Sequence, residues 1–226
     1  MSLMRIDASE LARNPSNRLP VALCLDVSSS MAGEPIKELN DGIRLFIEAV
    51  GKDDCASASV ELLVVTFADT PRVQTEFSTV DKIQSAKVTA TGGSTDLGGG
   101  VSLALAQLGE RKELYRRLGI DYFQPWLVLM TDGQPTTKNH NAASTLTLEL
   151  EGSKKLTVFP IGIGPGADMD VLRKFSQKKP PLKLRGLKFR EFFQWLSASA
   201  STVSASRPGE QLKLDTAGIA DWGEVS

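Results

Sequence analysis

Oxygen-bearing side chains gather directly after an apolar run near the start of the chain. Asp26, Ser28 and Ser30 occupy alternate positions behind the run 21–25, where a buried strand is expected to end. One carboxylate and two hydroxyls are anionic and neutral oxygen ligands of the kind that small hard cations such as Mg²⁺ prefer. Taken alone, the pattern fits equally well a polar turn in which Ser30 caps the next helix.

Two further segments place oxygen atoms at comparable points. A glycine-rich turn, 92–98, contains Thr95 and leads into an apolar helical pattern. The apolar run 127–131 is followed by Asp132 and is then broken by glycine and proline. In open α/β sheets, ligands bind beyond the carboxyl ends of the strands, where the strand order reverses. We therefore expect these segments to meet at one edge of a sheet.

The order D-x-S-x-S, then threonine in a G-G-x-T turn, then T-D-G after an apolar strand resembles the von Willebrand factor A-type (vWA) domain family. The resemblance covers roughly residues 18–205 and implies a metal-ion-dependent adhesion site (MIDAS). The ligands that it implies are Asp26, Ser28, Ser30, Thr95 and Asp132.

The strings 26–36 and 189–197 also resemble a bacterial branch related to the tellurium-resistance protein TerY. That branch usually has glycine where this chain has Ser29. The difference removes no ligand, and it stiffens the loop only if the position needs a positive φ. The TerY-like branch implies a cytoplasmic protein of a bacterial stress-response or tellurite-resistance pathway, with phosphatase and kinase components as candidate partners.

The resemblance to vWA domains implies a metal-gated adhesion surface and no catalytic residues. If the three hydroxyls contact the ion directly and the two aspartates hold its waters, the ion keeps much of its charge. It then attracts a Glu or Asp carboxylate from a protein partner. Mg²⁺ is the expected cofactor, with Mn²⁺ and Ca²⁺ as alternatives. The sequence does not predict which other residues contact the partner.

A phosphoryl-transfer or nucleotide-hydrolysing enzyme that uses the same strand-end aspartates is the competing interpretation. A dehalogenase-like phosphotransferase needs a second aspartate two residues after the first, where this chain has Ser28. An actin-like ATPase needs a glycine-rich hairpin where residues 28–30 are serines. A serine hydrolase would need His140, the only histidine, and the chain has no G-x-S-x-G elbow. We therefore expect a binding protein and no enzyme.

Bulk properties exclude several other classes. A chain of 226 residues is long enough for one well-buried domain, and 41% apolar with 23% charged residues is typical of a globular protein in water. A net charge of −1 argues against a nucleic-acid binder. No apolar run approaches the roughly 20 residues that span a bilayer, and the start does not resemble a signal peptide, so we expect a cytoplasmic protein. Cys24 and Cys55 are expected to be buried reduced thiols.

Apolar periodicity predicts strands that alternate with helices. This pattern favours an α/β fold: a Rossmann-like, doubly wound, mostly parallel sheet with one antiparallel edge strand and helices on both faces. The expected strands are 21–27, 60–68, 72–77, 126–131 and 157–163, of which 72–77 is the antiparallel edge. The expected helices are 35–50, 97–118, 142–154, 169–177 and 189–201.

The expected domain boundaries are an N-terminal extension (1–17), a vWA-like domain (18–205) and a C-terminal tail (206–226). Eight Lys or Arg residues and no acid lie within 173–190, which indicates a solvated basic edge or a docking surface for an acidic partner. The tail is either mobile or held to the domain by Leu212, Leu214 and Trp222. The aromatic residues of 189–201 recur at helical spacing and are expected to pack on the sheet.

Overall fold

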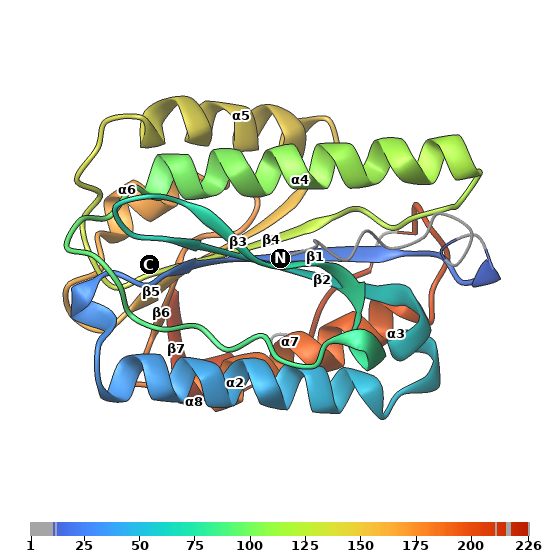
Figure 1. The fold of residues 1–226 in the computed structure, drawn as a ribbon, viewed down its shortest axis with the longest axis horizontal. Coiled ribbons are helices and arrows are strands. Elements are labelled where there is room, and N and C mark those ends of the chain that lie inside the picture. The colour runs from blue at the N-terminus through green and yellow to red at the C-terminus, as the bar shows by residue number, and fades with distance from the viewer. Residues whose placement is uncertain (1–10, 12, 211, 216–217, 226) are drawn as a thin grey trace.

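A seven-stranded sheet lies between two layers of helices in the computed structural model, which describes residues 11, 13–210, 212–215 and 218–225 (Figure 1). The strands are β1 (Leu19–Asp26), β2 (Val60–Phe67), β3 (Arg72–Thr79), β4 (Trp126–Thr131), β5 (Thr157–Ile163), β6 (Leu182–Leu184) and β7 (Gly223–Val225). The helices are α2 (Glu34–Gly51), α3 (Asp54–Ser59), α4 (Leu97–Leu118), α5 (His140–Gly152), α6 (Met169–Arg173), α7 (Phe189–Ser204) and α8 (Ile219–Trp222). Two 3-10 turns, η1 (Ser29–Met31) and η2 (Val80–Lys82), complete the described elements.

The strand order is β3-β2-β1-β4-β5-β6-β7. β1, β2, β4, β5 and β6 run parallel, whereas β3 and β7 are antiparallel to their neighbours. The predicted mostly parallel, doubly wound sheet is confirmed, although an antiparallel strand lies at each edge and not at one alone. The chain builds one side of the sheet from β1 to β3 and then crosses to β4, so the strand order reverses between β1 and β4.

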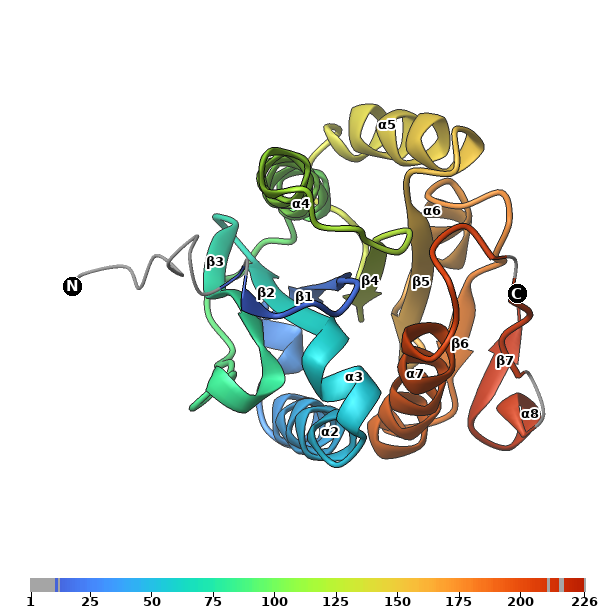
Figure 2. The same ribbon diagram turned by 90° about the vertical axis from the view of Figure 1, so that its right-hand side faces the viewer.

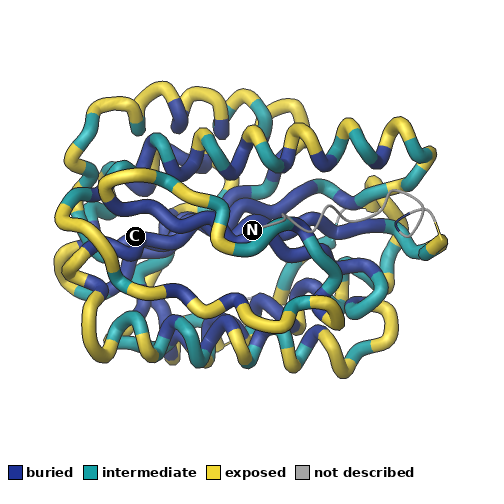
Figure 3. The backbone as a smooth tube through the Cα atoms, viewed as in Figure 1, coloured by how far each residue is buried: buried dark blue, intermediate teal, exposed yellow. Residues whose placement is uncertain are grey.

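Figure 2 shows the helices on both faces of the sheet, with α2, α3 and α7 on one side and α4, α5 and α6 on the other. β1, β2, β4 and β5 are buried almost throughout, the edge strands β3 and β7 are partly exposed, and the helices carry exposed positions on their outer sides (Figure 3). Alternate residues of β1 serve the two layers: Leu23 and Leu25 join the core under α2 and α7, whereas Ala22 and Cys24 join the core under α4. The sheet separates two apolar cores, as the alternation of side chains along a strand requires.

The aromatic residues of α7 belong to the core, as predicted. Phe189, Phe192 and Phe193 are fully buried, and the ring of Phe193 packs edge-on against Phe46 of α2 at 6.2 Å between centroids. Truncating one such side chain typically costs about 3–5 kcal/mol, so α7 is a major part of the stability of this layer.

The C-terminal segment packs against this layer. Trp222 is buried, with its ring centroid 5.9 Å from that of Phe192 and 6.0 Å from that of Trp195. The indole N–H of Trp195 donates to the carbonyl of Asp215 at 2.6 Å, and β7 pairs with β6. Of the two alternatives for the tail, the structure shows the packed one for its described residues. The domain boundaries themselves remain a prediction.

The short elements were not expected from the sequence. α3 contains six residues, and β6 and β7 contain three each, too few for a periodic pattern to emerge. One expectation was wrong: Cys24 is buried, but Cys55 is exposed, because it lies in the first turn of α3, which buries Ala56 and Ser59 instead. Within the described residues, no helix has the length and apolar character needed to cross a membrane.

Candidate metal centre

The carboxyl ends of β1 and β4 carry the first and last of the predicted site residues. Asp26 is the last residue of β1, and Asp132 directly follows β4. Thr95 stands two residues before α4, whose N-terminal end lies at the same end of the molecule, on the left in Figure 1. This is the point at which the strand order reverses, where open α/β sheets bind their ligands.

Asp26 is fully buried and holds hydrogen bonds on both carboxylate oxygens. Its Oδ1 accepts from the backbone N–H of Ser28 at 2.9 Å, and its Oδ2 accepts from the hydroxyl of Thr131 at 2.5 Å. Burial raises the pKa of the Asp26 carboxyl above its ordinary value; the hydrogen bonds from Thr131 and Ser28 oppose this shift, and Asp132 adds to it. Among the described residues, no Lys, Arg or His forms an ion pair with Asp26.

A line of hydroxyls joins Asp26 to Asp132. The Oγ atoms of Ser28 and Ser30 are 3.0 Å apart, and Ser30 donates to Oδ1 of Asp132 at 2.8 Å. Ser28 is buried, whereas Ser30 is exposed and Asp132 half-buried. Burial also raises the pKa of Asp132, against the effect of the hydrogen bond from Ser30. Four of the five predicted residues thus form one connected group that opens to solvent.

Thr95 approaches this group from the α4 side. Its backbone N–H donates to the hydroxyl of Thr136 at 3.0 Å, and the N–H of Thr136 donates to the carbonyl of Thr95 at 3.1 Å. These two bonds tie the glycine-rich turn to the loop after β4. A Cβ placed on Gly133 would lie 3.9 Å from the hydroxyl of Thr95, so this side chain faces the residue next to Asp132.

Several supporting residues were not found by sequence reasoning. The carboxylate of Asp69 accepts from Ser94 N at 2.9 Å and from Ser94 Oγ at 2.5 Å, and these bonds hold its pKa below the ordinary value. Gly92 has φ +69°, and a Cβ there would lie 2.3 Å from Oδ2 of Asp69, so the turn requires glycine. Thr131 did carry a signal, because it directly precedes Asp132 at a strand end.

Asp96 caps α4. Its Oδ1 accepts from Gly99 N at 3.0 Å and from Asn139 Nδ2 at 2.7 Å, which links the start of α4 to the start of α5. Ser29 does not need a positive φ, since Lys154 is the only non-glycine residue with positive φ in the described part of the chain. The serine therefore strains nothing in this loop.

The donor set suits a hard cation. Two carboxylates and three hydroxyls offer oxygen ligands, and neither a thiol nor an imidazole is among them. No group of three or more His, Cys, Asp and Glu side chains with metal-binding geometry occurs in the described residues, so a cation here would depend on the hydroxyls. The buried carboxylate of Asp26, which has no cationic partner in the part of the chain that the structure describes, fits such an ion.

Comparisons with known proteins identify the family of the fold. The model of the von Willebrand factor type A domain matches residues 21–190. Comparison with curated proteins gives no match.

Three solved structures share the fold. A von Willebrand factor type A protein from Catenulispora acidiphila is 19% identical, with a TM-score of 0.61 over 82% of this chain and 43% of its own. Proximal thread matrix protein 1 from the mussel byssus, with a zinc-occupied MIDAS motif, is 19% identical, with a TM-score of 0.58 over 88% and 49%. The pilus adhesin SpaC from Lactobacillus rhamnosus GG is 10% identical, with a TM-score of 0.66 over 83% and 30%.

This chain spans less than half the length of each of these proteins. At such identities, the likeness concerns the fold. The family model covers most of the chain, and the chain belongs to the von Willebrand factor type A domain family.

Proposed function

We propose that this chain is a metal-dependent protein-interaction domain that binds a carboxylate of a protein partner through a divalent cation. The proposed ligands are Asp26, Ser28, Ser30, Thr95 and Asp132. The observation that carries the proposal is the state of Asp26: a fully buried carboxylate that contacts hydroxyl and amide donors and has no cationic partner among the described residues. Burying a charge in this way is costly unless a cation compensates it.

The residues of the site have different roles. Thr131 and the backbone of Ser28 orient the carboxylate of Asp26, while Ser30 and Asp132 lie at the solvent-exposed mouth of the group. When bound, the cation supplies an electrophilic position for an outside carboxylate. With the three hydroxyls in direct contact and the two aspartates holding its waters, the ion would keep much of its positive charge for a Glu or Asp of the partner.

Oxygen ligands favour Mg²⁺, with Mn²⁺ and Ca²⁺ as alternatives. Zinc joins this set because the byssus protein carries zinc in its MIDAS motif. The wider setting in our proposal is a cytoplasmic bacterial stress or tellurite-resistance pathway with phosphatase or kinase components as partners. It rests on the resemblance to the TerY-like branch alone.

A phosphoryl-transfer enzyme remains the second candidate, and one observation disfavours it. Both carboxylate oxygens of Asp26 already accept hydrogen bonds within the chain, and the side chain is fully buried. A nucleophilic aspartate needs an oxygen that can reach the phosphoryl group. We therefore propose that the domain binds and does not catalyse.

Titration calorimetry with Mg²⁺ tests the metal site. We expect binding to the parent chain, loss of binding in Asp26→Asn and a roughly 10–100-fold weaker affinity in Ser30→Ala. The control is Asp81→Asn, which removes an exposed carboxylate on η2 and should leave the affinity unchanged. Equal affinity in parent and Asp26→Asn would contradict the ligand assignment.

The interaction itself is tested with cell extract passed over immobilised parent and Ser30→Ala domains, each with Mg²⁺ and with chelator. We expect a partner that the parent retains only with Mg²⁺ and that Ser30→Ala does not retain. The enzyme alternative is tested by phosphate release from ATP. Mg²⁺-dependent turnover that disappears in Asp26→Asn would favour the enzyme over the binding domain.

A further inference from the structure

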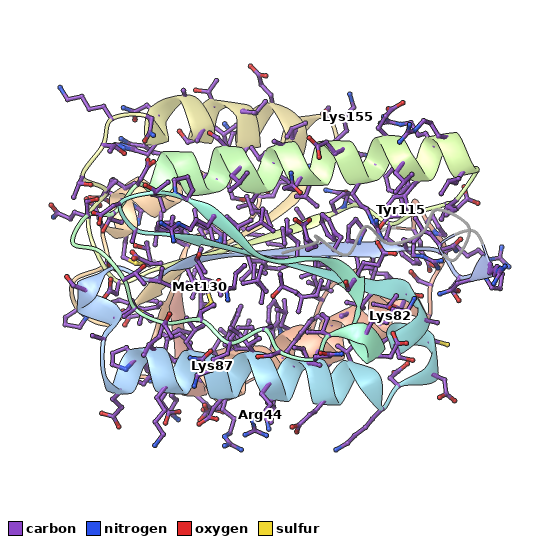
Figure 4. The ribbon with its side chains drawn as sticks, in the orientation of Figure 1. Arg44, Lys82, Lys87, Tyr115, Met130 and Lys155 are labelled. Carbon is purple, nitrogen blue, oxygen red and sulfur yellow. The ribbon has the colours of Figure 1, made fainter. Side chains whose placement is uncertain are left out.

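A cavity lined by basic side chains lies at the opposite end of the sheet from the metal centre. Its volume is about 700 Å³, and it lies between the C-terminal half of α4, the start of β4, the turn between α5 and β5, the loop after α6, and residues 203, 206, 209, 210, 212 and 214. Figure 4 labels Lys155, one of its lining residues, on the side of the molecule that carries Tyr115. We call it the basic cavity; its cationic lining residues are Lys112, Arg116, Lys154, Lys155, Lys178 and Lys179.

We propose that the basic cavity binds a small phosphate-bearing anion of about the size of a nucleotide. Its volume lies in the range of small-molecule sites, roughly 300–1,000 Å³. The cationic groups come from three segments that are distant in the sequence and meet only in the folded chain. A cavity of this volume holds a compact ligand more readily than an extended protein segment.

The positive charge of the basic cavity is not neutralised within the described residues. The acids in the lining are Glu151 and Glu210. Glu151 is buried, and its carboxylate already accepts from Ser176 Oγ at 2.7 Å and from Gln177 N at 2.9 Å. The described ion pairs involve none of the five lysines of the basic cavity; only its arginine is paired, to Glu113 at 2.8 Å. This excess of positive charge is local, because the net charge of the whole chain is −1.

The positive charges of the cavity also repel one another, which disfavours the charged form of its lysines. Burial lowers the pKa of Lys112, and the neighbouring charges of Arg116 and Lys155 lower it further. Burial likewise lowers the pKa of Lys179, although Glu151 opposes the shift. An anion placed among these groups would relieve the repulsion and restore their ordinary basicity.

Apolar surface lies beside the cations. Trp126, Phe123 and Leu156 are among the lining residues and give the cavity apolar edges for the organic part of a ligand. Lys179 already places its ammonium 4.9 Å from the ring centroid of Phe159, which shows that cationic and aromatic groups meet here. Lysine ammonium groups bind phosphate as point charges. Five of the six cations of the basic cavity are lysines, which suits a phosphate-bearing anion.

Titration calorimetry in chelator tests the proposal with the metal site disabled. The probes are tripolyphosphate and ATP, added to the full chain. We expect both to bind. Tighter binding of ATP would identify a nucleotide as the source of the phosphates, because the apolar edges then contribute; equal affinity would identify the phosphate chain alone.

The decisive variant is Lys155→Glu, which reverses an exposed charge of the basic cavity and should weaken binding of both probes roughly tenfold or more. Lys52→Glu makes the same change in net charge at an exposed position outside the cavity and should leave both affinities within about twofold. Lys112→Gln provides a second test without charge reversal, and circular dichroism checks the folding of each variant.

Three outcomes would overturn the proposal. The first is absence of binding to the parent chain. The second is an equal loss in Lys155→Glu and Lys52→Glu, which would indicate attraction to net charge alone. The third is tighter binding of an aspartate-rich peptide than of tripolyphosphate at the same site, which would make the basic cavity a dock for an acidic protein segment.

Discussion

Two fully buried carboxylates on neighbouring strands, Asp26 and Glu61, have opposite surroundings. Asp26 ends β1, whereas Glu61 is the second residue of β2 and pairs with the second residue of β1, so the two acids lie at opposite ends of the sheet. Arg111 Nε lies 2.6 Å from Glu61 Oε2, and Arg18 Nε lies 3.3 Å from its Oε1. The hydroxyl of Tyr115 also donates to Glu61.

The difference separates a structural acid from a chemically available one. Glu61 is neutralised by two arginines. Arg18 also donates to the carbonyls of Leu11 at 3.0 Å and Asn14 at 2.9 Å, so this network ties these two residues to the sheet. Asp26 is buried to the same extent, but no cationic side chain of the described residues pairs with it. A buried carboxylate that the fold leaves without a counter-ion is therefore the better indicator of a ligand site than burial alone.

The largest expected effect on stability comes from replacing Glu61, the structural acid. Glu61→Gln leaves two buried guanidinium groups without their anion, so the free energy of unfolding should fall by about 3–5 kcal/mol, as measured by urea denaturation. Glu113→Gln breaks the exposed ion pair with Arg116 and should change the free energy of unfolding by less than about 1 kcal/mol. A similar small loss in both variants would mean that Glu61 is not the centre of a stabilising network.

Metal removal gives the next effect. At a Mg²⁺ concentration about 100 times the dissociation constant, the parent chain should gain about 2.7 kcal/mol, and chelator should abolish the gain. For a chain of this length that corresponds to a rise of roughly 5–10 °C in the melting temperature. Glu61→Gln should be less stable than the parent but should gain the same free energy of unfolding from Mg²⁺. Asp26→Asn should gain none. An increment that survives in Asp26→Asn would place the ion elsewhere.

Without a metal ion, the destabilisation of the folded state by the buried carboxylate of Asp26 depends on pH. Its folded pKa is raised, so its ionisation destabilises the native state as pH rises through the range from the unfolded pKa, about 3.9, to the folded one. Asp26→Asn removes this dependence, and at pH 7 in chelator it should be more stable than the parent by roughly 1–2 kcal/mol. Denaturation at pH 4 and pH 7 measures it. A variant that is less stable than the parent at pH 7 would show that Asp26 is compensated without metal.

Thr131→Val tests the hydroxyl that orients Asp26. Losing this donor should cost about 1–1.5 kcal/mol and should weaken Mg²⁺ binding roughly tenfold. Thr147→Val is the matched control: its hydroxyl is equally buried and donates to the carbonyl of Ser144 at 2.7 Å on α5, so it should affect stability but not metal affinity. Equal metal affinity in the two variants would remove Thr131 from the site.

The smallest effect concerns the basic cavity at the amino end of the sheet. Lys154 follows α5 with φ +57°, a conformation in which glycine is usual. Lys154→Gly should raise the free energy of unfolding by about 0.5–1 kcal/mol while weakening tripolyphosphate binding. Ser153→Gly, at φ −82°, relieves no strain and should not stabilise the chain. A stabilised Lys154→Gly with unchanged anion affinity would separate this lysine from the proposed ligand.

Much of the fold could be predicted from local sequence. The bounds of α4, β4 and β5 agree with the expected ranges, because long apolar patterns bounded by glycine and polar residues carry a strong signal. Asp26, Ser28, Ser30, Thr95 and Asp132 could be named from the resemblance to vWA domains, because the motifs that carry it are short and local. Their convergence at one end then follows from parallel strand order. Their role as metal ligands remains a proposal.

Contacts between distant segments were decided only by the tertiary structure. α3, β6 and β7 are too short to form a periodic pattern, and β7 becomes a strand only because β6 offers it an edge. The exposure of Cys55 depends on which side of α3 meets the core. The pairing of Glu61 with Arg18 and Arg111, and the gathering of lysines around the basic cavity, join residues tens of positions apart. Charge and hydrogen-bond partners across such distances are set by packing, and a linear pattern does not record them.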